Sequence, residues 1–146
     1  MQGIIRHRAL WAAAALMILA GAWTAQAQEK KATASAAKDE VLSGTLIDTK
    51  CYTADHNNIG NDHGTMKGCG TTCANEGIPV GLLVGGKKDG RVVILIAPSK
   101  SFANYIGQSA KVSGTAMLGR DALVPTKVEV KQEDGSYKAI DISAMM

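Results

Sequence analysis

The chain has 146 residues, with 16 lysines and arginines against 13 aspartates and glutamates. This near-balance of charge excludes the dense basic surface with which proteins bind nucleic acid or anionic lipid. Only 4% of the residues are aromatic, so a hydrophobic core must come from Val, Ile, Leu and Ala, and base-stacking platforms are lacking.

The first 27 residues have the pattern of a cleavable secretory signal peptide. Arg6 and Arg8 give a positive start, an uncharged run follows over residues 9–23, and Ala25-Gln26-Ala27 matches the small-residue cleavage site. The apolar run is about 15 residues long, short of the roughly 20 that span a membrane, and an uncleaved N-terminal anchor is the alternative. We therefore predict a periplasmic or secreted protein without a membrane span after cleavage.

The three cysteines, Cys51, Cys69 and Cys73, all follow this signal peptide. An exported protein works in an oxidising compartment, where disulfides form. Because three is an odd number, at least one sulfur must be free, bound to a ligand or paired with another molecule.

Residues 28–40 are polar, rich in Ala and Lys, and present no apolar face, which indicates a flexible spacer. One folded domain is expected over residues 41–146, long enough for a single hydrophobic core. It begins with residues 41–48, which alternate between two faces as a strand requires.

A cysteine- and histidine-bearing insertion follows this first strand. Residues 51–64 break all periodicity and are rich in turn formers, which indicates a loop. Residues 65–76 predict a short helix that is capped by Thr65 and ended by Gly77. Gly68 and Gly70 each cost this helix about 1 kcal/mol relative to Ala, so it needs support from a disulfide or a metal.

The rest of the chain predicts strands. Residues 79–86 and 91–98 form a hairpin, residues 99–105 a short helix, residues 110–118 and 122–130 a second strand pair, and residues 137–142 a final short strand. Pro125 places its strand at an edge or a bulge. This order predicts a mainly β fold, a small OB-like barrel of five or six strands, with an open β-sandwich as the alternative.

The insertion also contains a candidate metal site formed by Cys51, His63, Cys69 and Cys73. On the predicted helix, Met66 shares a face with Cys69 and Cys73, at positions i, i+3 and i+7. Thiolate and thioether ligands favour Cu(I), and three cysteines with one histidine also bind tetrahedral zinc. The possible cofactor is therefore Cu or Zn, and the exported location favours copper.

Two other interpretations of the cysteines stay open. A disulfide from Cys51 to Cys69 or Cys73 closes a loop of about 20 residues and stabilises the fold by roughly 3 kcal/mol. Alternatively Cys69, near a helix N-terminus, is a redox-active thiol with a lowered pKa. His56, in a loop of Asn and Asp, is expected to be solvated. Serine triads, EF-hand loops and the c-type haem motif do not occur in the sequence.

Several short motifs resemble a family of small, uncharacterised, exported bacterial OB-like proteins, and the resemblance covers nearly all of the chain after the signal peptide. The motifs are Asp48-x-x-Cys51-Tyr52, His63, Cys69-x3-Cys73, residues 77–81 and residues 105–114. The resemblance implies an OB-like fold. It also implies that Cys51, His63, Cys69 and Cys73 belong to one feature, either structural or metal-binding.

Together these features predict a non-enzymatic exported barrel whose cysteine and histidine segment binds a Cu or Zn ion or is locked by a disulfide. Two alternatives remain: a periplasmic thiol-redox protein, and a module that binds a peptide, a protein or an oligosaccharide on the barrel face. Nucleic acid is not an expected partner.

Overall fold

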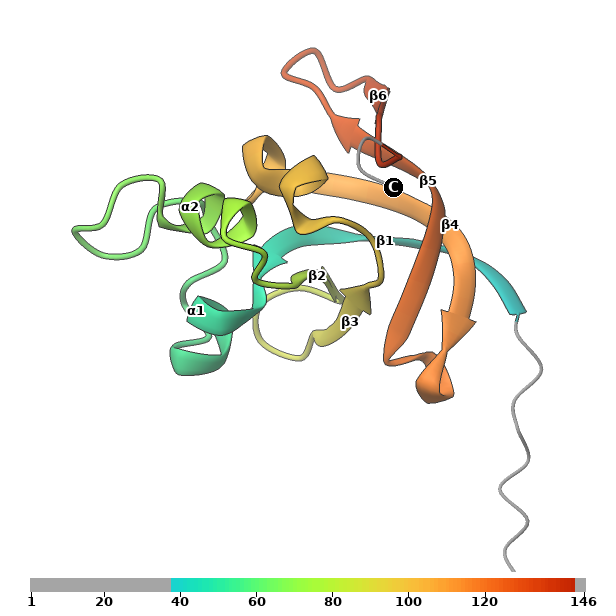
Figure 1. Ribbon diagram of the computed structural model, residues 1–146, viewed down its shortest axis with the longest axis horizontal. Helices are drawn as coiled ribbons and strands as arrows, with labels where there is room; N and C mark the ends of the chain where they lie inside the picture. The colour runs from blue at the N-terminus through green and yellow to red at the C-terminus, as the bar shows by residue number, and fades with distance from the viewer. Residues whose placement is uncertain (1–37, 144–146) are drawn as a thin grey trace, which may run out of the picture. The chain divides into compact units, whose positions relative to one another are not determined.

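A computed structural model describes residues 38–143 (Figure 1). The predicted signal peptide and residues 28–37 of the predicted spacer lie outside the described residues. The elements in chain order are β1 (Lys38–Asp48), α1 (Thr49–Ala54), α2 (Cys69–Asn75), β2 (Val80–Val84), β3 (Arg91–Leu95), the 3₁₀ helix η1 (Ser99–Tyr105), β4 (Ser109–Met117), the 3₁₀ turn η2 (Leu118–Arg120), β5 (Ala122–Lys131) and β6 (Tyr137–Ile140).

The six strands form one sheet in the order β3-β2-β1-β4-β5-β6. A parallel pairing of β3 with β5, at Ile94–Ala122 and Leu95–Leu123, closes the first five strands into a barrel. All the other pairings are antiparallel, and β6 adds to the free edge of β5. A closed five-stranded barrel with one extra strand confirms the predicted OB-like fold and excludes the open sandwich.

The barrel closes because small residues occupy its sharp corners. The β4–β5 register shifts between Ser113 and Gly114, opposite Pro125, which confirms that the strand of Pro125 carries a bulge. A side chain on Gly114 would collide with the Val124 carbonyl group, so only glycine allows β4 and β5 to approach this closely.

Aliphatic residues from every barrel strand fill the core, together with Phe102, the only phenylalanine of the chain. Phe102 lies on η1 and is fully buried, so the connection between β3 and β4 packs onto the same core as the strands. The helix predicted over residues 99–105 is therefore present, as a 3₁₀ helix.

The first strand and the second α-helix have other bounds than predicted, and one helix was not predicted. β1 begins at Lys38 and not at residue 41, because Lys38 to Glu40 pair with β4 and Glu40 makes an ion pair with Arg120. The helix α2 covers only Cys69–Asn75, and the residues before it form turns. The helix α1 was not predicted. Within residues 38–143, no helix is long and apolar enough to cross a membrane.

Candidate metal centre

Both α-helices and the loop between them lie where β1 ends (Figure 1). Asp48, the last residue of β1, caps α1: its Oδ1 accepts hydrogen bonds from the backbone N–H groups of Lys50 at 2.9 Å and Cys51 at 3.4 Å. Tyr52 anchors α1 by packing against Ile47 and Leu83. The cap and this anchor together hold Cys51 next to Asp48.

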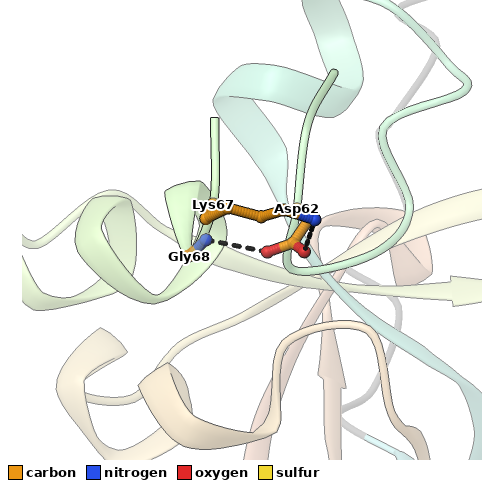
Figure 2. Close-up of polar contacts among 3 residues, drawn as sticks. All are labelled: Asp62, Lys67 and Gly68. Carbon is orange, nitrogen blue, oxygen red and sulfur yellow. Dashed lines mark hydrogen bonds and ion pairs between the residues drawn. The ribbon is translucent and has the colours of Figure 1, made fainter. Parts of the chain in front are cut away.

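The loop that carries His63 is closed by backbone and ionic contacts. His63 and Met66 exchange two backbone hydrogen bonds of 3.0 Å. Asp62 accepts one hydrogen bond from the Lys67 ammonium group at 2.9 Å and another from the Gly68 N–H at 2.8 Å, as Figure 2 shows. The bond from Lys67 lowers the pKa of the Asp62 carboxyl group. These contacts fix the turn between His63 and α2.

His63 is buried, with only 3% of the residue exposed. Its Nε2 lies 2.8 Å from the carbonyl oxygen of Gly60. A carbonyl oxygen only accepts hydrogen bonds, so Nε2 is the donor, and in the neutral ring Nδ1 then carries the lone pair. Nδ1 is buried and has no hydrogen-bond partner among the described residues. Histidines that bind metals are oriented in this way, with the second ring nitrogen donating to a carbonyl group or a carboxylate.

Contacts with η1 and the loop position α2. The Thr71 hydroxyl group donates to the Ala103 carbonyl oxygen at 2.8 Å, and the Thr71 N–H donates to Asn61 Oδ1 at 2.7 Å. Gly70 lies so close to Ile106 that a Cβ atom there would be 2.6 Å from Ile106 Cγ2. This close packing sets the position of Cys69, the first residue of α2.

These elements bring four potential ligands together, and their donor atoms all lie within 4.8 Å of one another: Asp48, Cys51, His63 and Cys69. The Sγ atoms of Cys51 and Cys69 are 3.7 Å apart. Two thiolates bound to one tetrahedral zinc ion at about 2.3 Å lie about 3.8 Å apart, so the observed separation fits a shared ion. A disulfide needs about 2.05 Å, and none forms within residues 38–143.

The third thiol, that of Cys73, lies one helical turn after Cys69 and outside the four-residue group. Burial, followed by the nearby Asp48 carboxylate, raises its pKa to about 11. Burial, followed by the neighbouring Asp48 carboxylate and Cys69 thiol, raises the pKa of Cys51 to about 12. In the metal-free protein both thiols are therefore protonated at neutral pH, which disfavours a reactive thiolate at either position.

The structure thus brings together three of the four predicted ligands, Cys51, His63 and Cys69, and places the fourth, Cys73, beside them. The prediction that the sulfur atom of Met66 lies on the same helix face as those of Cys69 and Cys73 is wrong. Met66 is 57% exposed, because α2 starts only at Cys69 and Met66 lies in the preceding turn.

Two further residues lie close to these ligands in the sequence, His56 and Asp48. His56 is exposed, as predicted, and stacks on the Tyr52 ring with the ring centres 4.6 Å apart. Asp48 was not predicted as a ligand, although its position three residues before Cys51 is a signal: an aspartate at a helix N-cap lies close to the side chains of the first turn.

No family model, no curated protein and no solved structure matches this chain. Its function is therefore inferred from the chemistry of the four-residue cluster and of the residues that hold it.

Proposed function

We propose that this protein is a non-enzymatic metal-binding protein that holds one Zn²⁺ or Cu(I) ion between Asp48, Cys51, His63 and Cys69. The observation that carries the proposal is the Nδ1 atom of His63, which is buried and has no hydrogen-bond partner in the described part of the chain. The other ring nitrogen already bonds to the Gly60 carbonyl oxygen. Asp48 contributes a second buried atom, Oδ2, which has no hydrogen-bond partner within residues 38–143.

These two atoms are costly in the absence of a ligand. Leaving a buried polar group without a hydrogen bond costs about 1–3 kcal/mol. Asp48 is 1% exposed and His63 is 3% exposed, so bulk water has little access to either side chain. A cation bound between them would satisfy both atoms at once and offset that cost.

The set of donors supports an ion of intermediate or soft character. Calcium and magnesium take oxygen ligands almost exclusively, whereas two thiols and an imidazole are ligands for zinc and copper. The single carboxylate favours zinc, which accepts oxygen, nitrogen and sulfur in a tetrahedral site.

The number of ligands supports a role other than catalysis. Catalytic zinc sites have three protein ligands and keep one position open for water or substrate, whereas structural sites are closed by four. Four donors from β1, α1, α2 and their connecting loop would close the site and join the insertion to the barrel.

Metal titration of the reduced, metal-free protein tests this function. We expect one Zn²⁺ or one Cu(I) per chain, measured by competition with a chromogenic chelator, and at least a hundredfold weaker binding after the double substitution Cys51→Ser/Cys69→Ser. Native protein that binds neither ion stoichiometrically, or a double variant that binds as tightly, would contradict the proposal. Circular dichroism of the variant controls for folding.

We also propose that the protein is exported, on the basis of the charge, the apolar run and the cleavage pattern of residues 1–27. The expected product in a bacterial host is a periplasmic or secreted protein. Its intact mass should correspond to a chain that begins at Gln28. Protein recovered uncleaved from the membrane fraction would identify residues 1–27 as an anchor instead.

A further inference from the structure

Two of the four proposed ligands are thiols whose sulfur atoms are nearly in contact. The Sγ atoms of Cys51 and Cys69 are 3.7 Å apart, so a shift of less than about 2 Å would bring them to the length of a disulfide bond. The two cysteines lie on different helices, Cys51 within α1 and Cys69 at the start of α2.

Both helices are short and bury few of their own residues, so such a shift would break few apolar contacts. α1 has six residues, and Tyr52 is its one buried residue. α2 has seven residues, of which only Gly70 and Ala74 are buried, and its N-cap Gly68 offers no side chain to hold the first turn. Local rearrangement costs least where few apolar contacts must be broken.

We propose that this site releases its metal ion on oxidation: a small-molecule disulfide converts Cys51 and Cys69 into an intramolecular disulfide, and the ion leaves. The inference rests on the proposed metal-binding function and names how that function is regulated. Metal binding and disulfide formation exclude each other, because both use the same two sulfur atoms.

The exchange balances without any other reactant. One cysteine thiolate attacks the external disulfide, forms a mixed disulfide and displaces the first external thiolate. The second cysteine thiolate then attacks the protein sulfur of the mixed disulfide and displaces the second external thiolate. Two electrons pass from the protein sulfurs to the external disulfide, and the ion keeps only the ligands of Asp48 and His63.

Cys73 is poorly placed to form a disulfide with Cys69. It follows Cys69 by four residues on the same helix, where Cβ atoms are about 5–6 Å apart, farther than the 3.5–4.5 Å of a disulfide. Cys69 is therefore not expected to pair with Cys73, and a disulfide between Cys51 and Cys69 would leave Cys73 as the odd thiol.

The test treats zinc-loaded protein with oxidised glutathione and follows zinc with a chelating dye. We expect one zinc ion released per disulfide formed, an intact mass lower by two hydrogen atoms, and full rebinding of zinc after reduction. Trypsin cuts after Lys50 and Lys67, which separates Cys51 from the other two cysteines. In the variant Cys73→Ser the crosslink between the two peptides can join only Cys51 and Cys69.

Cys73→Ser is expected to release zinc at the native rate, within about twofold, and to give this crosslinked peptide pair. Zinc that stays bound after the disulfide has formed, loss of the crosslink in Cys73→Ser, or oxidation that gives only glutathione adducts would overturn the proposal. Each of these outcomes leaves metal binding by the reduced protein intact. Failure of the reduced protein to bind zinc would instead overturn the proposed function.

Discussion

At the scale of single residues, the imidazole of His63 carries most of the case for a metal ion. Its Nε2 is held by the Gly60 carbonyl oxygen, and its Nδ1 faces no partner within the described residues. The second histidine of the insertion, His56, is exposed and stacked on Tyr52. A substitution of His63 therefore tests the metal site, and the same substitution of His56 is its control.

The substitution His63→Ala is expected to weaken zinc binding at least tenfold, because it removes one of four ligands and the hydrogen bond that orients it. His56→Ala is expected to leave the zinc affinity within about twofold of native. Chelator competition measures both. Equal effects of the two substitutions would remove His63 from the site.

The protonation of the thiols predicts a pH dependence. Burial raises the pKa of Cys51 to about 12, so this thiol is protonated in the metal-free protein and must lose its proton when it binds an ion. The apparent zinc affinity is therefore expected to rise with pH, by about tenfold per pH unit for each proton displaced. Titrations between pH 6 and pH 8 measure the slope, and a flat profile would exclude thiolate ligands.

The sequence predicts which cysteines and histidine form this site better than it predicts how they are arranged. Cys51, His63 and Cys69 stand out in the sequence because Cys and His are rare, and the structure brings all three together. Asp48 does not stand out among 13 acidic residues. Its role depends on the turn from β1 into α1. This helix has only six residues, so no periodic pattern in the sequence predicts it.

At the scale of elements, α1 and α2 depend on contacts from outside themselves. Isolated helices of six or seven residues are not stable in water. The packing of Gly70 against Ile106 and the hydrogen bonds of Thr71 are what hold α2 to η1 and the loop. The sequence shows that such support is needed, since two glycines weaken this segment, but it does not show which element supplies it.

The substitution Gly70→Ala tests this packing. The added Cβ would lie 2.6 Å from Ile106 Cγ2, so we expect a loss of about 1–3 kcal/mol in the free energy of unfolding and weaker zinc binding. The control is Gly60→Ala, because a Cβ there meets no atom closer than 3.9 Å. Chemical denaturation measures both variants. A Gly70→Ala protein as stable as the control would show that α2 is free to move away from η1.

At the scale of the whole molecule, a metal ion would link the insertion to the barrel. The donors come from the end of β1, from α1, from the loop and from α2, while the barrel has its own core around Phe102. The barrel was predictable because its strands carry alternating or continuous apolar residues, with glycines where it bends. The insertion was not, since its order comes from caps, single hydrogen bonds and sulfur atoms far apart in sequence.

Zinc is therefore expected to stabilise the whole domain. An ion at a hundred times its dissociation constant adds about 2.7 kcal/mol to the free energy of unfolding, which corresponds to a rise in Tm of roughly 10 °C or more for a domain of this size. Thermal unfolding with zinc and with a chelator measures the difference. The double variant Cys51→Ser/Cys69→Ser should show no rise, and an equal rise in both proteins would place the zinc elsewhere.

The most direct test of the metal site is X-ray absorption at the zinc edge of the loaded native protein. We expect two sulfur neighbours at about 2.3 Å and two nitrogen or oxygen neighbours at about 2.0–2.1 Å, from Cys51, Cys69, His63 and Asp48. A shell of nitrogen and oxygen atoms alone would contradict the account, because the ion would then lie outside the cluster in which Cys51 and Cys69 meet.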